Sequence, residues 1–147
     1  MKRAEQLIKL SREHHGSLSM AKKISNIAAN GSDAELLQAI QTIRDYNEAE
    51  LEEHFQHEER TLFAPIFKDY SENTELVEMA TRLLKEHGYI RMMIPRLNPE
   101  TAREDLAEFG ELLKNHTRLE ERELFPQIEA LFTPEQMDAI SKFVALD

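Results

Sequence analysis

The sequence contains no cysteine, which excludes disulfides, iron–sulfur clusters and thiolate metal sites. Any metal would therefore need nitrogen and oxygen ligands. Four glycines and five prolines among 147 residues leave few natural breaks, so long helices are expected. No hydrophobic run approaches the roughly 18 apolar residues of a membrane span. The N-terminal segment MKRAEQLIKLSREHH lacks the apolar core of a secretory signal, so a cytoplasmic location is expected.

Basic residues are also in the minority, with 18 Lys and Arg against 28 Asp and Glu and a net charge of −10. This balance disfavours binding to nucleic acid or to an anionic membrane surface. The length suits one domain, residues 1–147, with one buried core.

The few turn-forming segments divide the chain into helices. Ser32 with Glu35, and Thr133 with Gln136, have the spacing of a capping box at a helix start. The expected helices are residues 4–29, 33–68, 74–94 and 99–131, followed by a short one at 134–145. These lengths predict an all-α fold, an antiparallel up-down-up-down four-helix bundle with a short C-terminal helix.

One short pattern occurs twice. The segments HFQHEERTLFAP, from His54, and HTRLEERELFP, from His116, both read H-x-x-x-E-E-R-x-L-F, and their offset is 116 − 54 = 62 residues. The proline follows one residue later in the first copy. Pro65 and Pro126 are expected to kink or end their helices near the same level.

Each long helix also carries histidine. Helical phase places His14, His54, His87 and His116 on apolar faces, whereas His15 is rotated about 100° from His14. His57 is off the apolar stripe of its helix and is expected at the surface. Glu59 and Glu121, with Arg60 and Arg122, are expected to form an exposed salt-bridge lattice, the alternative being contacts with inner residues.

The repeated pattern has a physical explanation. Residues four apart share a helix face, so Glu58 points with His54 and Glu120 with His116, towards the bundle interior. Buried carboxylates and imidazoles are unfavourable unless they are paired or bind metal. Imidazole and carboxylate without sulfur suit iron, manganese or zinc, and the number of ligands fits a pair of irons best.

These patterns resemble the hemerythrin-like, or HHE cation-binding, family over about residues 10 to 130. The carriers of the resemblance are the two H-x-x-x-E segments, the histidines in LSREHH and the lone histidine late in the third helix. It implies a four-helix bundle with two non-haem Fe²⁺/Fe³⁺ ions. The implied metal ligands are His54, Glu58, His87, His116 and Glu120, with either His14 or His15 from the first helix. Glu58 and Glu120 would bridge the ions.

One position departs from the family. Oxygen-carrying members have two histidines four apart in the third helix, but here Arg91 takes the place of the partner of His87. This favours reaction with, or sensing of, O₂, NO or peroxide, or iron handling, over simple oxygen carriage. Nothing else in the sequence indicates catalysis, so a metal-binding and oxygen-binding protein is expected rather than an enzyme. The alternative is a metal-responsive regulatory module that is read by a protein partner.

Overall fold

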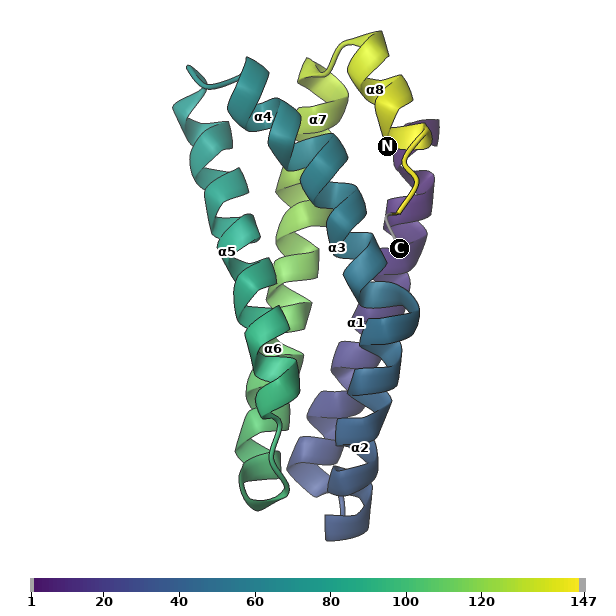
Figure 1. Cartoon of the computed structure of the whole chain (residues 1–147), viewed down its shortest axis with the longest axis vertical. Coiled ribbons are helices and arrows are strands. Elements are labelled where there is room, and N and C mark those ends of the chain that lie inside the picture. The colour runs from purple at the N-terminus through teal and green to yellow at the C-terminus, as the bar shows by residue number, and fades with distance from the viewer. Residues whose placement is uncertain (1, 146–147) are drawn as a thin grey trace.

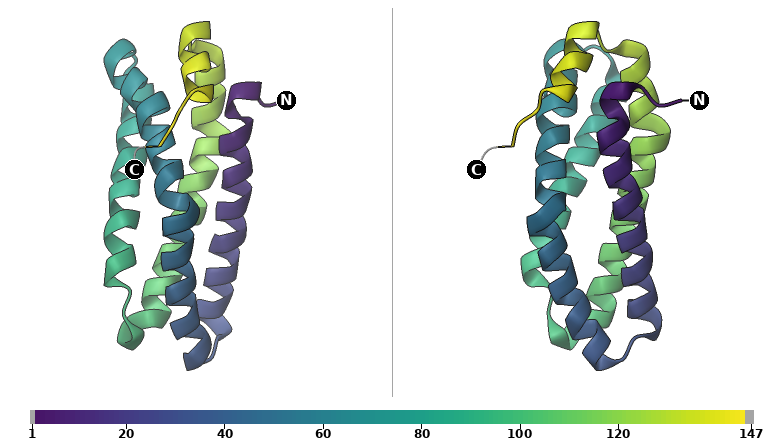
Figure 2. Two further views of the ribbon diagram at one scale, coloured as in Figure 1. Left: turned by 45° about the vertical axis from the view of Figure 1, so that its right-hand side comes forward. Right: turned by 90° about the vertical axis from the view of Figure 1, so that its right-hand side faces the viewer.

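The computed structural model describes residues 2–145, and all regular structure in that range is helical. Four long helical stretches lie side by side along the long axis of the molecule and are joined by short connections (Figures 1 and 2). The first stretch is α1 (Ile8–Asn30), which follows a 3-10 turn at Glu5–Leu7. The second stretch comprises α2 (Asp33–Tyr46), α3 (Glu52–Glu58) and α4 (Ala64–Asp69), and the third is α5 (Thr74–Arg96). The fourth comprises a 3-10 turn at Pro99–Thr101, α6 (Ala102–Leu119) and α7 (Phe125–Leu131). A short helix, α8 (Pro134–Ser141), follows. Within residues 2–145, none of the helices is long and apolar enough to cross a membrane.

The predicted helix starts are present. The hydroxyl of Ser32 accepts a hydrogen bond from the backbone N–H of Glu35, whose carboxylate accepts one from the backbone N–H of Ser32. Thr133 and Gln136 form the same reciprocal pair at the start of α8. Both capping boxes satisfy backbone donors that would otherwise lack partners, so they fix where α2 and α8 begin.

The second and fourth stretches continue past their prolines. Pro65 and Pro126 lie at the starts of α4 and α7, and each is preceded by a π-helical turn, Glu59–Phe63 or Glu120–Leu124. A proline has no N–H, and its ring collides with the carbonyl four residues earlier in an α-helix. Those carbonyls, of Thr61 and Arg122, lie inside the wider π turns. The prolines therefore change the helix type without ending the helical stretch. A further π turn, Asn47–Leu51, joins α2 to α3.

The C-terminal helix ends at Ser141, earlier than the expected residue 145. Phe143 leaves the helix and stacks on the imidazole of His57, with ring centroids 4.4 Å apart. The Nε2 of His57 donates a hydrogen bond to the carbonyl of Ile140 at 2.7 Å. The expectation of an exposed His57 was therefore wrong, since only 4% of this residue is exposed. The helix phase predicted its direction away from the bundle centre, but α8 covers that face.

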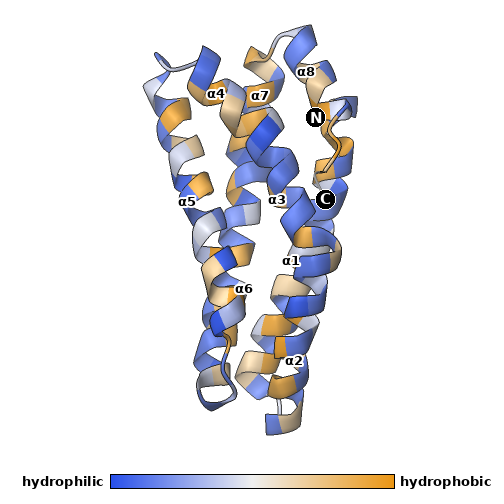
Figure 3. Ribbon diagram, in the orientation of Figure 1, coloured by the Kyte–Doolittle hydropathy of each residue, from blue (hydrophilic) through white to orange (hydrophobic). Residues whose placement is uncertain are grey.

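The hydrophobic core has two parts. Hydrophobic and hydrophilic residues alternate along the long helices (Figure 3), as expected for amphipathic helices. One buried cluster includes Ile24, Ile43, Phe55 and Phe109, and the other includes Leu10, Leu62, Phe63, Phe125 and Ile128. Along α1, His14 lies between Leu10 of one cluster and Ala21 of the other. A buried polar layer therefore separates two apolar layers.

A glycine allows α1 and α6 to approach closely. A Cβ added at Gly110 would collide with the hydroxyl of Ser25 and lie 3.1 Å from the carbonyl oxygen of Ala21. The first and fourth helical stretches, which both contribute to the polar layer, are therefore in contact through backbone at this point.

Candidate metal centre

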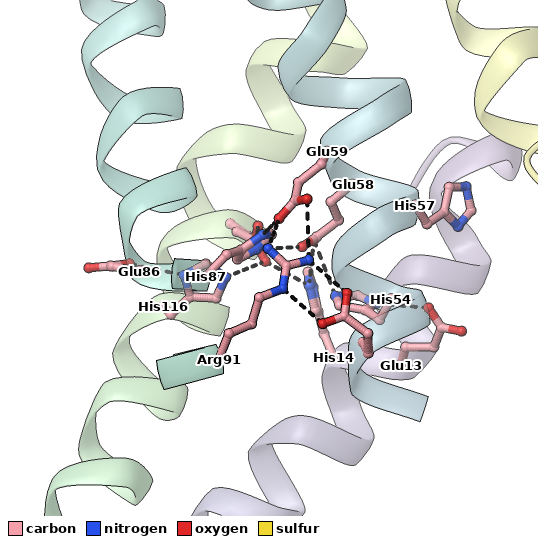
Figure 4. Close-up of polar contacts among 12 residues, drawn as sticks. Glu13, His14, His54, His57, Glu58, Glu59, Glu86, His87, Arg91 and His116 are labelled. Atoms are coloured by element: carbon pink, nitrogen blue, oxygen red, sulfur yellow. Dashed lines mark hydrogen bonds and ion pairs between the residues drawn. The ribbon is translucent and has the colours of Figure 1, made fainter. Parts of the chain in front are cut away.

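Six side chains form the buried polar layer, and each of these residues is at most 4% exposed. They are His14, His54, Glu58, His87, His116 and Glu120. Their side chains converge from all four long helical stretches (Figure 4). The seventh predicted residue, His15, is exposed and lies outside this cluster. Of the two histidines in the first helix, His14 is therefore the one that meets the others.

The histidines of the first and second stretches face the two glutamates. The Nε2 atom of His14 lies 3.1 Å from Oε2 of Glu58 and 3.0 Å from Oε1 of Glu120. The Nε2 atom of His54 lies 3.2 Å from Oε2 of Glu58. Both imidazoles therefore present the same nitrogen to the interior.

The histidines of the third and fourth stretches repeat this arrangement on the other side. The Nε2 atom of His87 lies 3.1 Å from Oε1 of Glu58 and 3.8 Å from Oε2 of Glu120. The Nε2 atom of His116 lies 3.3 Å from Oε1 of Glu120. Each glutamate thus lies near three histidines and has at least one of them on each side.

The cluster divides into two groups that could each hold a metal ion. One comprises His14, His54, Glu58 and Glu120, and the other comprises Glu58, His87, His116 and Glu120. Within each group, one possible ligand atom from every residue lies within 4.8 Å of the others. Because Glu58 and Glu120 belong to both groups, two neighbouring cations could share their carboxylates.

Local helix geometry builds this arrangement. His54 and Glu58, like His116 and Glu120, are four residues apart and therefore share a helix face. A π turn begins directly after Glu58 and another begins at Glu120. Single π turns within α-helices are frequent at functional sites.

The charges of the cluster are strongly interdependent. Burial alone would raise the pKa of Glu58, but His54, His14 and His87 hold it well below its ordinary value of 4.5. Burial and the nearby Glu58 carboxylate oppose ionisation of Glu120, yet His116 and His14 lower its pKa to about 2. Burial would lower the pKa of His14, but the carboxylates of Glu120, Glu121 and Glu58 raise it well above 6.5. The glutamates are therefore anions that require nearby positive charge.

The polar atoms at the centre fit bound cations. Glu58 Oε1, both carboxylate oxygens of Glu120 and the Nε2 atoms of His87 and His116 are buried without a hydrogen bond of suitable geometry. The ion pairs among these atoms do not have the geometry of hydrogen bonds. Buried polar atoms without partners are rare in proteins. Carboxylate oxygens and imidazole nitrogens are suitable ligands for iron, manganese or zinc.

A second group of carboxylates was only partly foreseen. Glu59 forms a salt bridge with Arg91, and Glu121 forms one with Arg3. The expectation of an exposed lattice was nevertheless wrong, because both glutamates are half-buried and bond to histidines of the cluster. Glu13 and Glu86 make equivalent contacts and were not identified from the sequence. Their only sequence signal is that each directly precedes a cluster histidine.

Arg91 does not reach the shared glutamates. Its guanidinium donates hydrogen bonds to Glu52 at 2.8 Å and to Glu59 at 2.6 Å. It also lies over the ring of Phe55, which stacks on His87 with centroids 3.9 Å apart. Arg91 therefore contacts neighbours of His87.

Comparison with known protein families gives an independent result. The family model described as the hemerythrin HHE cation binding domain matches residues 7–128, which is most of the chain and includes the whole cluster. Comparisons with curated proteins and with solved structures found no significant match. The family match and the paired histidine–glutamate groups lead to the same conclusion, that this chain belongs to the hemerythrin HHE cation-binding family.

Proposed function

We propose that the protein binds two non-haem iron ions in the buried cluster and that these ions bind or react with O₂, NO or peroxide. His14 and His54 would hold one ion, His87 and His116 would hold the other, and Glu58 and Glu120 would serve both. The observation that carries this proposal is the convergence of four Nε2 atoms on two shared, buried carboxylates. The proposal includes the antiparallel up-down-up-down topology, which the short connections between consecutive helical stretches support.

The ligand set favours a reactive centre. Each ion would have two imidazoles and two shared carboxylates, which leaves coordination positions open on an iron ion. Bound iron would supply the electrons or the binding site for the small molecule. The chain itself would hold the ions by His Nε2, offset their charge with Glu58 and Glu120, and limit water access with the two apolar clusters. Arg91 supplies no ligand nitrogen, which supports sensing, redox reaction or iron handling over simple oxygen carriage.

Anaerobic loading with ferrous iron tests this function. We expect two irons per chain and a change in visible absorption when the loaded protein meets air, NO or hydrogen peroxide. A coloured product that reverses on removing the gas indicates carriage or sensing, whereas irreversible bleaching with loss of peroxide indicates redox chemistry. A loaded protein whose spectrum stays the same with all three reagents would contradict the proposed reactivity. The double variant His54→Ala/His116→Ala is the control that removes one histidine from each group.

The placement of the cluster also suits a second role, as a metal-responsive regulatory module. All four long helical stretches contribute to it, so metal occupancy would stabilise their packing together. A partner protein could then distinguish the loaded and metal-free forms. Hydrogen exchange measured with and without iron tests this alternative: broad slowing of exchange across α1, α3, α5 and α6 supports it, and protection restricted to the ligand residues argues against it. We also propose that the protein is cytoplasmic and that it has a protein partner in this regulatory role.

A further inference from the structure

Every histidine of the cluster has its second nitrogen on an outer carboxylate. The four Nδ1 atoms lie 2.7 to 3.0 Å from glutamate oxygens. The pairs are His54 with Glu13, His87 with Glu59, His116 with Glu86, and His14 with Glu121. We call Glu13, Glu59, Glu86 and Glu121 the outer glutamates. Figure 4 shows three of these pairs around the cluster, with His57 pointing away from it.

The outer glutamates connect the helical stretches in a closed order. Glu13 of the first stretch bonds to His54 of the second, and Glu59 of the second bonds to His87 of the third. The remaining pairs continue from the third stretch to the fourth and from the fourth to the first: Glu86 to His116, and Glu121 to His14. Glu13 and Glu86 each directly precede a cluster histidine in the sequence, yet both bond to the histidine of the following stretch instead. Each stretch therefore orients the histidine of the following stretch.

Each outer glutamate also has a basic partner on its outer side. The ion pairs are Lys9 with Glu13 at 2.7 Å, Arg91 with Glu59 at 2.6 Å, Arg82 with Glu86 at 3.3 Å, and Arg3 with Glu121 at 3.2 Å. A positively charged side chain on the outer side holds the carboxylate in place and offsets its charge. The same order of groups thus occurs four times around the cluster: a Lys or Arg side chain, an outer glutamate, a histidine and a shared glutamate.

We propose that the four outer glutamates are positioning residues that act across helices. This inference rests on the proposed metal site. An ionised carboxylate only accepts hydrogen bonds, so the Nδ1 atom beside it must carry the proton and donate. The Nε2 atom then keeps its lone pair, which points to the interior where a cation would bind. Such partners fix the tautomer and ring orientation of metal-binding histidines. The ring of contacts closes only when all four helical stretches are packed together, so metal affinity depends on the complete bundle.

The cross-helix order gives a specific test by NMR. The protein, labelled with ¹⁵N-histidine and loaded with Zn²⁺, should show the Nδ1–H signals of its four cluster histidines. In the variant Glu86→Gln, we expect the signal of His116 to shift or broaden while that of the adjacent His87 stays in place. A Glu13→Gln variant should likewise change His54 and leave His14. A change confined to the histidine adjacent in sequence, or no change in any, would overturn the inference.

Metal affinity provides a second readout with a matched control. Arg3 bonds to both Glu121 and Glu129, whose side chains are 25% and 22% exposed, but only Glu121 contacts a histidine of the cluster. We expect Glu121→Gln to weaken Co²⁺ binding about 10–100-fold and to change the visible spectrum of bound cobalt. Glu129→Gln should leave affinity and spectrum unchanged, even where it lowers thermal stability.

The outcomes separate this inference from the proposed function. If the wild-type protein fails to bind two Co²⁺ ions, the proposed metal site itself is wrong. If it binds two ions and both variants behave alike in affinity and spectrum, the metal site stands and the positioning role of the outer glutamates is refuted. Glu13→Gln, measured in the same way, provides an independent variant in case Glu121→Gln does not fold.

Discussion

At the scale of single residues, the central feature is a pair of buried, ionised carboxylates surrounded by histidines. Glu58 and Glu120 are fully buried carboxylates whose ionised forms are stabilised by the surrounding histidines. In a metal-free chain, protonated imidazoles provide that stabilisation. In the proposed loaded chain, cations replace those protons while the Nε2 atoms become ligands. The same six side chains are therefore compatible with two states of the cluster.

Removing one histidine from either group should lower metal content and stability together. We expect His54→Ala and His116→Ala each to retain less iron than the wild type and to melt at a lower temperature, because a ligand is lost and a buried carboxylate loses a partner. Iron analysis and thermal melting measure both effects. His15→Ala is the control, since His15 is exposed outside the cluster, and it should keep both irons. Equal iron content in all four proteins would refute the ligand assignment.

Metal uptake should release protons. Burial lowers the pKa of His14, but the nearby carboxylates outweigh it and raise this pKa well above 6.5. The proton on His14 therefore stabilises the metal-free fold below about pH 6.5. That stabilisation is lost as pH rises through the folded-state pKa. Iron binding should therefore acidify a weakly buffered solution, and affinity should fall as pH decreases. Uptake without proton release, or full retention of metal well below about pH 5, is incompatible with imidazole ligands.

The burial of the histidine–glutamate pairs could be predicted from the sequence because the spacing within each pair is short and regular. His54 with Glu58 and His116 with Glu120 are visible as residues four apart on an apolar face. The contacts of Glu13 and Glu86 were not predictable in this way, because each joins residues of different helices, with sequence separations of 41 and 30. Helical phase assigns a direction to a side chain, but it does not identify which neighbouring helix that side chain meets. The burial of His57 was missed for the same reason, since α8 returns from a distant part of the chain.

At the scale of helices, the positions of two π turns follow the two prolines rather than the repeated histidine–glutamate pattern. The two repeated histidines, His54 and His116, are 62 residues apart, whereas Pro65 and Pro126 are 126 − 65 = 61 residues apart. The π turns show the same displacement: they end at Phe63 and Leu124, two residues before each proline. Helix boundaries were predictable from caps and turn residues. The π turns were not, because a local π turn leaves no signal in the 3.6-residue period of an α-helix.

The close approach of α1 and α6 should be sensitive to one added methyl group. In Gly110→Ala, the new Cβ meets Ser25 and the backbone of Ala21, and such overpacking destabilises by about 1–3 kcal/mol. Gly16→Ala is the matched control within α1, because a Cβ there has no neighbour within 4 Å. The control should be stabilising by about 0.5–1 kcal/mol through helix propensity. Urea unfolding of both variants measures the difference, and equal effects would contradict the backbone contact.

At the scale of the whole molecule, a polar layer lies between two apolar clusters and draws on every long helical stretch. This arrangement links metal occupancy to overall stability, because ions that bind only the folded chain favour folding. Amphipathic patterning predicted the helices and their inner faces. Patterning does not predict the division of the core into two clusters, since this division depends on the four histidines meeting at one level.

Removing metal should therefore destabilise the entire fold. At a free metal concentration about 100 times the dissociation constant, each occupied site contributes about 2.7 kcal/mol. For a protein of this size, each kcal/mol corresponds to about 2–4 °C in melting temperature. We expect a chelator to lower the melting temperature and added ferrous iron to restore it. An unchanged melting temperature after complete metal removal would instead indicate a helical scaffold that does not depend on metal.

The most direct test of the two-cation cluster is a crystal structure of the protein soaked with ferrous salt, with diffraction data collected at the iron absorption edge. We expect two anomalous-difference peaks, one beside Nε2 of His14 and His54 and the other beside Nε2 of His87 and His116, with Glu58 and Glu120 near both. A map with no peak among these six side chains, or with iron bound only elsewhere on the protein, would contradict this expectation.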